Sequence, residues 1–316
     1  MTLTALTSTE QPGRVIQRLR LLVRVIAWEL RRLRASRLLW LQALGFFALS
    51  LFLTWSGQIP LTLNHMKGTV LLYGFVAGTS AWGLFMTLST GPLMLLGMLL
   101  PFVNADGVTR DRSRRTHELL LATALPTWAY VWGRYLAGLV LSLGLALLML
   151  ASTLGMSGLL HLTVTDYPLP QTGAVLLLWV GMVFPATILV SSFGFALSTL
   201  LPRLATLVKV VILVGWIVGA LVIPRVLSNN PTLPAWYVNW DPTSGITTLG
   251  LLTSYSIHLS PSITSEAQLQ QFVLSMENKM PDLAGWFVPH LLLAGFSLLL
   301  VLIAAFAFKR IRDMLN

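Results

Sequence analysis

The sequence lacks cysteine altogether and is poor in charge. The absence of cysteine excludes disulfides and thiolate metal sites, so redox chemistry gives no information about the compartment. Charged residues make up 10% of the 316 positions, whereas soluble domains carry about 25%. Hydrophobic residues make up 55% of the chain, and its mean hydropathy is +0.77. This balance excludes an ordinary water-soluble domain and favours a membrane protein.

Catalytic motifs are also missing. A phosphate-binding loop needs a Gly-Lys-Ser/Thr run, but none of the lysines (Lys67, Lys209, Lys279 and Lys309) follows a glycine. The five histidines are scattered singly, and neither His-x-x-Glu-His nor Gly-x-Ser-x-Gly occurs. We therefore expect no catalytic residue, no metal and no cofactor in this chain. Any ATP-driven work must come from another polypeptide.

Long apolar stretches dominate what is present. Six of them can cross about 30 Å of hydrocarbon as helices, at residues 38–55, 82–103, 133–159, 174–201, 206–226 and 286–308. We expect the apolar residues 70–81 to extend the second span outward or to form a half-helix. The prediction is an all-α polytopic membrane protein with a leader (1–37), a six-span transmembrane domain (38–308) and a short tail (309–316).

The basic residues indicate the orientation, because Lys and Arg accumulate in cytosolic loops. With both termini in the cytosol, 18 of the 21 basic residues lie inside, and only Lys67, Arg225 and Lys279 lie outside. The net charge of +10 is then a signal of topology, and we expect no nucleic-acid partner. The predicted location is the plasma membrane, with both termini cytosolic.

The predicted spans contain almost no ionisable side chain. The exceptions are Arg134 and Lys209 near inner ends and His290 near an outer end. Charges inside the membrane are costly and are usually kept for function, such as ion-coupled transport. Coupling to an ion gradient through the centre of the bilayer is therefore not expected.

The leader has the periodicity of an amphipathic helix. We expect this helix to lie in the cytosolic headgroup layer, with its arginines drawn to anionic membrane lipids. A basic flank that only sets the topology is the alternative. The apolar positions that recur at three- and four-residue spacing are Val15, Ile16, Leu19, Leu22, Val23, Ile26, Leu30 and Leu33.

The connection between the second and third spans, residues 104–131, has a distinctive order. A charged run over 106–115 is followed by Thr-His-Glu-Leu-Leu-Leu-Ala-Thr over 116–123, and Pro126 precedes the next span. This pattern predicts a short amphipathic helix that lies along the membrane, ends before Pro126 and faces a cytosolic partner.

These residues resemble the membrane subunits of ABC exporters of the type-2 permease class. That family has charged residues, then Gly-Thr-Leu-Glu-Leu-Leu-Leu-Ala-Thr-Pro, then a span that opens with Gly-Lys-Tyr-Leu. The positions that match are Thr116, Glu118, Leu119, Leu120, Leu121, Ala122, Thr123, Gly133, Tyr135 and Leu136. The departures are Arg115 for glycine, His117 for leucine, Ala124 for proline and Arg134 for lysine.

The resemblance implies that this segment is a coupling helix seated in a cytosolic ATPase subunit. A solvated loop whose arginines only set the topology is the alternative. The residues that the resemblance assigns to ATPase coupling are Arg110, Arg112, Arg114, Arg115, Thr116, Glu118, Leu119 and Leu120.

The segment 227–285 is the longest predicted connection outside the membrane, and 266–278 has the pattern of a short helix. Proline and asparagine mark turns in it. In the family this position holds re-entrant helices that form an outer gate, which assigns Trp236, Tyr237 and Trp240 to that gate. An outer cap without a gating role is the alternative.

In the family, the second and fifth spans line the path between two permease copies. The fifth span also has two glycines spaced for close helix contact, at 215 and 219. The candidates for the pathway or the dimer interface are Phe85, Leu88, Met94, Ile212, Gly215, Trp216 and Gly219.

The resemblance thus implies a permease that works with a second copy or paralogue and with two ATPase subunits, which bind the ATP and magnesium. An apolar path favours export of an amphiphile such as a lipid, a peptide or a drug-like molecule, and copper or sodium handling stays an alternative. The rival functions are a non-transporting scaffold or signalling subunit and a passive channel.

Overall fold

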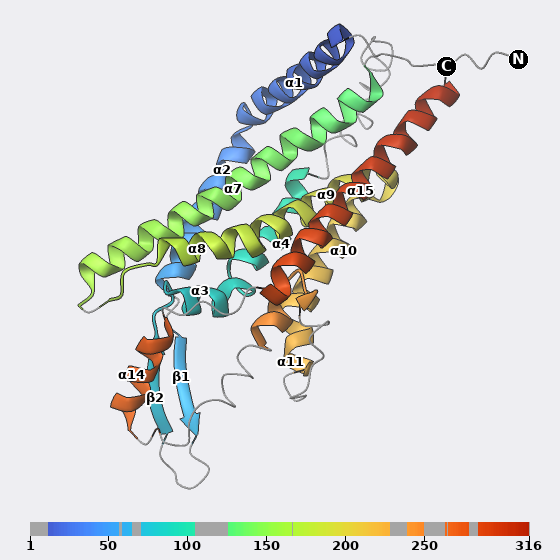
Figure 1. The fold of residues 1–316 in the computed structure, drawn as a ribbon. Coiled ribbons are helices and arrows are strands. Elements are labelled where there is room, and N and C mark those ends of the chain that lie inside the picture. The colour runs from blue at the N-terminus through green and yellow to red at the C-terminus, as the bar shows by residue number, and fades with distance from the viewer. Residues whose placement is uncertain are drawn as a thin grey trace, which may run out of the picture.

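The structure is a computed structural model that describes residues 12–56, 59–64, 71–104, 126–165, 167–227, 239–249, 263, 265–277 and 284–315. Helices dominate the described residues (Figure 1). Four helices are long and apolar enough to cross a membrane: Thr127–Thr163, Thr172–Leu200, Pro202–Leu227 and Gly285–Phe308. The number rises to six if each of two bent helix pairs counts as one span. The prediction of a helical membrane protein is therefore confirmed, and the number of candidate spans is four to six.

The first bent pair joins the leader to the first predicted span. Helix α1 (Pro12–Arg34) and helix α2 (Arg37–Trp55) are separated at Ala35 and Ser36, and their axes differ by 74°. The predicted leader helix is therefore confirmed as a helix that is distinct from the span after it.

The second bent pair falls inside the second predicted span, which was expected to be continuous. Helix α3 (Ala81–Leu88) and helix α4 (Pro92–Asn104) meet at 45° across Ser89–Gly91. Pro92 explains the break, because its ring disfavours helical geometry at the preceding residue and its nitrogen has no hydrogen to donate. It then suits the first position of α4.

The remaining long helices follow the predicted spans and exceed some of their limits. Helix α7 (Thr127–Thr163) begins directly after Pro126, so the predicted break there is confirmed. Helices α8 (Thr172–Leu178) and α9 (Phe184–Leu200) are joined by a π-helical turn, η1 (Trp179–Val183). Helix α15 (Ala284–Leu315) continues through the predicted tail.

The fifth predicted span is a chain of short helical pieces. The 3-10 turn η2 (Pro202–Leu204) leads into α10 (Ala205–Ile217). A second π-helical turn, η3 (Val218–Val222), then leads into α11 (Ile223–Leu227). Much of this span's surface is exposed and apolar, as expected of a helix that faces lipid or another apolar surface.

A β-hairpin corrects the all-α prediction outside the helical bundle. Strand β1 (Ile59–Asn64) pairs antiparallel with β2 (Leu71–Val76), with Ile59 opposite Val76 and Asn64 opposite Leu71. The helical extension expected over 70–81 is therefore wrong for 71–76. Six residues are too few to cross a bilayer, and the alternation of β1 and the aromatic and branched residues of β2 suit a strand.

Helix α14 (Glu266–Glu277) confirms the short helix predicted in the long connection, over the residues that are described. It packs on the hairpin and on α3. The contact is a small apolar cluster formed by Val76, Trp82, Ile263, Leu269 and Val273.

The main core lies between α3, α4, α7 and the α8–α9 segment, and its largest buried side chains include Phe85, Met149 and Trp179. Polar contacts also join the helices: the Ser152 hydroxyl donates to the Ser50 hydroxyl over 2.6 Å, and the Trp179 indole donates to the carbonyl of Ala146 over 2.9 Å. Such contacts fix helix pairs where apolar side chains alone do not choose a partner.

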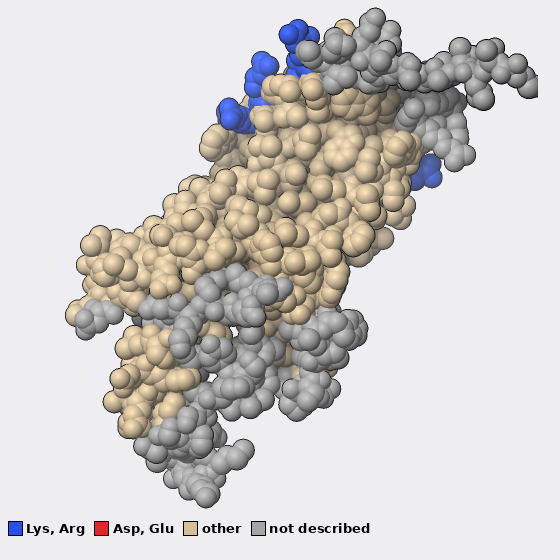
Figure 2. Space-filling model, in the orientation of Figure 1, with Lys and Arg blue, Asp and Glu red and all other residues tan. Residues whose placement is uncertain are grey.

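The two ends of the bundle differ. Helix α1, the start of α7 and the C-terminal end of α15 lie at one end, and the hairpin and α14 lie at the other (Figure 1). On the face shown in Figure 2, the Lys and Arg side chains of the described residues lie toward the first of these ends, most of them over α1. We call these the arginine end and the hairpin end.

Candidate functional site

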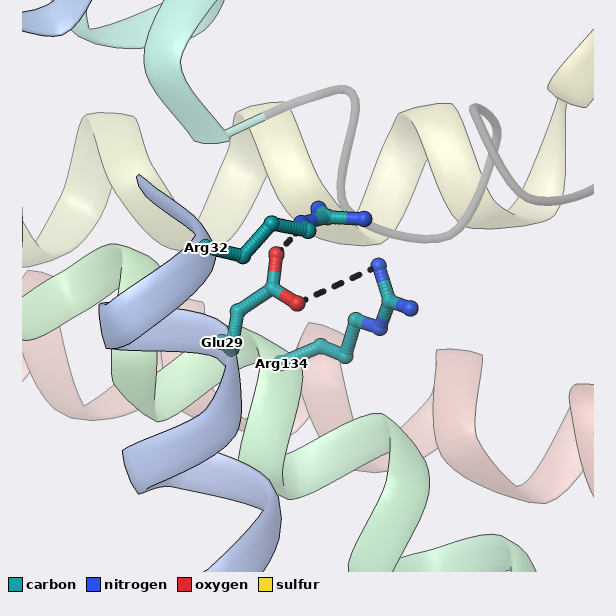
Figure 3. Close-up of polar contacts among 3 residues, drawn as sticks. All are labelled: Glu29, Arg32 and Arg134. Atoms are coloured by element: carbon teal, nitrogen blue, oxygen red, sulfur yellow. Dashed lines mark hydrogen bonds and ion pairs between the residues drawn. The ribbon is translucent and has the colours of Figure 1, made fainter. Parts of the chain in front are cut away.

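At the arginine end, a carboxylate is buried between two helices. Glu29 on α1 and Arg134 on α7 are each only 3% exposed. Nη1 of Arg134 lies 3.5 Å from Oε2 of Glu29, and Arg32, one turn along α1, forms an ion pair with Oε1 of the same carboxylate (Figure 3). The two carboxylate oxygens therefore face guanidinium groups from two different helices.

Aromatic rings complete the surroundings of Arg134. Its Cζ atom lies 5.4 Å from the ring centre of Trp28 on α1 and 5.1 Å from that of Tyr130 on α7. The Cζ atom of Arg32 lies 5.6 Å from the same Trp28 ring. A guanidinium over a ring face is attracted by the ring's quadrupole. The cluster is thus an ion pair enclosed by aromatic side chains, at the junction of α1 and α7.

The three residues that open the third span each contact a different partner. A Cβ atom at Gly133 would lie 2.5 Å from Cγ1 of Val25, so the lack of a side chain lets α1 approach α7. Arg134 pairs with Glu29, and the Tyr135 hydroxyl lies 2.8 Å from the Ser192 hydroxyl on α9. The Gly-Arg-Tyr run thus joins α1, α7 and α9.

This arrangement can hold helices in place. A buried ion pair adds little net stability compared with an apolar pair, yet removing one partner leaves a buried charge and is costly. The cluster therefore fixes how α1 seats on α7. Among the described residues, no three His, Cys, Asp or Glu side chains are grouped to hold a metal ion.

A second polar cluster lies at the hairpin end, in the segment 239–249. Residues 243–248 are all buried, so this part of the predicted outer connection packs within the protein. Asp241 stabilises the turn: its Oδ1 accepts from the amide and hydroxyl of Thr243, and its Oδ2 accepts from the amide of Ile246. Ser244 has a positive φ of 59°, so the chain reverses sharply there.

The segment sits against three of the predicted spans. The Ser244 hydroxyl contacts the sulfur of Met182 in η1 at 3.1 Å. Thr243 covers Gly219 in η3, where a Cβ atom would lie 2.9 Å from the threonine methyl. On α15, Nε2 of His290 lies 2.8 Å from the carbonyl oxygen of Asp241.

The predicted coupling residues lie outside the described residues, in 105–125: Arg110, Arg112, Arg114, Arg115, Thr116, Glu118, Leu119 and Leu120. Trp236 and Tyr237 of the predicted outer gate also lie outside them. Trp240 is described, is 40% exposed and directly precedes the buried part of the 239–249 segment. These assignments stay predictions.

The pathway and dimer candidates separate into buried and exposed positions. Phe85, Leu88 and Trp216 are buried in the main core, and Met94 and Ile212 pack against it. The indole of Trp216 occupies the space that a Cβ atom at Gly97 would need. Gly215 is exposed, with no atom near a Cβ there, whereas Gly219 lies under Thr243. Of the two glycines, Gly215 is the one with open space beside it.

Sequence reasoning missed Glu29 and gave Arg134 only a topological role. The signal for Glu29 was its position, because it lies on the same helical stripe as Leu22, Ile26 and Leu33. It is the only acidic residue of α1, and it occupies the face where the pattern places apolar side chains. An acid on that face is buried by the neighbouring helix and is stabilised by cationic partners.

The sequence matches no family model and no curated protein. The family resemblance therefore rests on the residues of the motif itself.

Proposed function

We propose that the chain is the membrane subunit of an ABC exporter of the type-2 permease class. In this proposal it works in the plasma membrane with a second permease copy or paralogue and with two cytosolic ATPase subunits that bind ATP and magnesium. It moves an amphiphilic substrate outward, and its own residues supply the path and the contact with the ATPase. The arginine end is the cytosolic side.

One observation carries the proposal. The Gly-Arg-Tyr run, which forms part of the resemblance, is also where α1, α7 and α9 are joined. Because α7 begins at Thr127, a push on the preceding coupling segment would reach α7 within about two helical turns of Arg134. From there the Glu29 ion pair and the Tyr135 hydroxyl would carry the displacement to α1 and α9. This arrangement suits a protein whose driving force enters from a cytosolic partner.

The test is reconstitution in liposomes with the candidate ATPase, the product of a neighbouring reading frame with Walker motifs and no spans of its own. ATP hydrolysis is measured with and without a fluorescent phospholipid and an amphiphilic dye as probe substrates. We expect Glu118→Arg to abolish probe-stimulated hydrolysis while the chain remains inserted. Glu266→Arg, the same change on exposed α14, is the matched control and should keep the stimulation.

Two results would contradict the proposal. The first is full stimulation in the Glu118→Arg variant, which would remove that residue from the coupling contact. The second is uphill movement of a probe by the purified chain without an ATPase, which would place the energy source within the chain itself.

A further inference from the structure

One face of α4 receives two other helices. Gly97 and Pro101 are four residues apart, so they share a helical face. A Cβ atom at Gly97 would lie 2.5 Å from Nε1 of Trp216 on α10, and a Cβ atom at Gly194 on α9 would lie 3.5 Å from Cα of Pro101. Helices α9 and α10 also contact each other. We call this meeting point the α4–α9–α10 junction.

Helices α4 and α9 run in the same direction. Trp286 lies beside α3 and η1, which precede α4 and α9, and Pro101 near the other end of α4 faces Gly194. Ser191, one turn before Gly194, is therefore level with Gly97, one turn before Pro101. The serine and the Trp216 ring lie at the same height of the junction.

Two hydroxyl groups of α9 lie on the face that meets α4. Ser191 and Ser198 flank Gly194 by three and four residues, and both are fully buried. Neither hydroxyl has a hydrogen-bond partner among the residues that the structure describes. The hydroxyls of Thr187 and Thr199 instead donate to backbone carbonyls of their own helical segment, over 2.6 and 2.7 Å. A buried hydroxyl without a partner is destabilising, so packing of α9 alone does not account for the two serines.

The Trp216 indole fills the junction without a hydrogen bond to fix it. The residue is 5% exposed, and its Nε1 has no partner within the described part of the chain. Trp179, in the same core, donates to the carbonyl of Ala146. Only Val208 and Trp216 are buried in α10, and the span that contains α10 is the least buried of the four long ones. Apolar packing alone therefore holds this ring in place.

Displacement of the ring would leave a space with small, polar walls. On the α4 and α9 sides these walls are the two glycines and the two serine hydroxyls of the junction. The space would have the size of an indole, and both hydroxyls would be open to a new partner. A ligand that replaces the ring would satisfy groups that the ring leaves without a bond.

The charges near the junction restrict the ligand. The sequences of α4 and α9 contain no ionisable side chain. Lys209 of α10 is two turns from Trp216, and its Nζ lies 5.7 Å from the ring centre of Phe102. An ion among these apolar side chains would lose its hydration without a close counter-charge. A hydroxyl group both donates and accepts, so it suits the two serines without that cost.

The outer side of the junction suits an acyl chain. Helix α4 exposes Met98 and Phe102, which are one turn apart, and α10 exposes Val211 and Val214. Helices α4 and α10 pack against each other, so these side chains belong to one lipid-facing region of the bundle. A lipid-like molecule can keep its tail there while its head group reaches the serines.

We propose that the α4–α9–α10 junction binds the uncharged, hydroxyl-bearing head group of a lipid-like molecule. The head group displaces the Trp216 ring and bonds to Ser191 and Ser198, and the tail stays in the lipid. As the site of an exported substrate it rests on the proposed function, and it narrows the amphiphile to one with a neutral head. As a binding site it needs no ATPase.

The test is photolabelling of the purified full chain in phosphatidylcholine nanodiscs, without an ATPase. The probe is diacylglycerol with a diazirine in one acyl chain, and phosphatidic acid with the same chains replaces its hydroxyl by a phosphate. The specific yield on the peptides of α4 and α10 is the part that excess unlabelled diacylglycerol removes. We expect specific labelling by diacylglycerol and several-fold less by phosphatidic acid. Trp216→Ala should raise the yield several-fold at low probe concentration, because no ring competes for the space.

The double variant Ser191→Ala and Ser198→Ala tests the polar contacts. It should lower the specific yield about tenfold, as expected from the loss of two hydrogen bonds to the head group. Because it removes only unpartnered hydroxyls, we expect its SDS-induced unfolding midpoint to be unchanged. The double variant Thr187→Val and Thr199→Val is the matched control on α9, since those hydroxyls bond to backbone carbonyls. It should keep the yield.

Three results would overturn the proposal. The first is equal labelling of the serine variant and its threonine control. The second is labelling by phosphatidic acid that equals or exceeds that by diacylglycerol, which would assign a charged ligand. The third is an unchanged yield in a folded Trp216→Ala variant. Failure of the ATPase reconstitution would contradict the proposed function and leave these yields unaffected, so the two failures are distinguishable.

Discussion

At the arginine end, α1 is joined to α7 through a buried carboxylate and two guanidinium groups. At the hairpin end, the Asp241 carboxylate stabilises the turn of the 239–249 segment, and one hydroxyl and one imidazole link the segment to the neighbouring helices. An ion pair between two helices is costly to break, because either partner left alone is a buried charge. The single hydrogen bonds between this segment and the helices each contribute less and can be lost one by one. The comparison predicts a rigid joint at the arginine end and a segment that can leave its seat at the hairpin end.

The largest effect is expected from reversing the charge of the buried acid. Glu29→Arg places three guanidinium groups together and should destabilise the protein by about 3–5 kcal/mol, the usual cost of breaking a buried pair. The measurements are SDS-induced unfolding in mixed micelles and the distance between spin labels at Arg24→Cys and Trp128→Cys. The distance should widen, because α1 leaves α7.

Two controls sharpen this result. Arg31→Glu reverses an exposed charge on the same helix and should change stability by no more than about 1 kcal/mol. The exchange Glu29→Arg with Arg134→Glu restores opposite charges and should recover part of the loss. A charge reversal at Glu29 with no effect on the label distance would mean that the ion pair does not seat α1.

The next effect is expected from filling the close approach between the same helices. Gly133→Leu forces a side chain into the space of Val25 and should cost about 1–3 kcal/mol by overpacking. Gly144→Leu is the matched control on α7, because no atom lies near its Cβ position. Equal unfolding midpoints for the two variants would show that α1 does not rest on α7 at this point.

A smaller effect is expected at the hairpin end. Asp241→Ala removes the acceptor for the amides of Thr243 and Ile246 and should cost about 1–2 kcal/mol, as the loss of a helix cap does. The spin-label distance between α1 and α7 should stay unchanged, while maleimide labelling of Thr248→Cys should become faster. A change at both ends would contradict their independence.

The smallest effect is expected from the ring beside the guanidinium groups. Trp28→Leu removes the aromatic face that lies near both Arg32 and Arg134 but keeps an apolar side chain. The expected loss is about 0.5–1 kcal/mol, because Trp28 is half exposed. A larger loss of unfolding free energy in Trp28→Leu than in Glu29→Arg would contradict this order, because the ring would then contribute more than the charge.

Much of the fold could be predicted because apolar length and proline act locally. Periodicity and the residues that start or stop helices predict the helix after Pro126 and the helix that begins at Glu266. The hairpin could not be separated from a span extension by hydrophobicity, because residues 71–76 are apolar in either structure. The signals that favour a hairpin are the short length of the two segments and the alternation of side chains in β1.

The sites were harder to predict because they depend on which helices become neighbours. Nothing local to Arg134 shows that it pairs with a residue 105 positions earlier, and a basic residue at the end of a span ordinarily serves topology. Asp241 followed by proline has the pattern of an exposed turn. Its burial follows from the packing of the segment against the π-helical turns of two other spans.

The interruption between α3 and α4 has a chemical consequence for a bundle so poor in intramembrane charge. Because Pro92 carries no amide hydrogen, the carbonyl oxygen of Leu88 loses the donor that residue 92 would supply in an unbroken helix. Leu88 is fully buried, so this carbonyl oxygen faces other groups of the protein and not the lipid. The break therefore places a backbone acceptor inside the apolar core, where only another group of the chain can reach it.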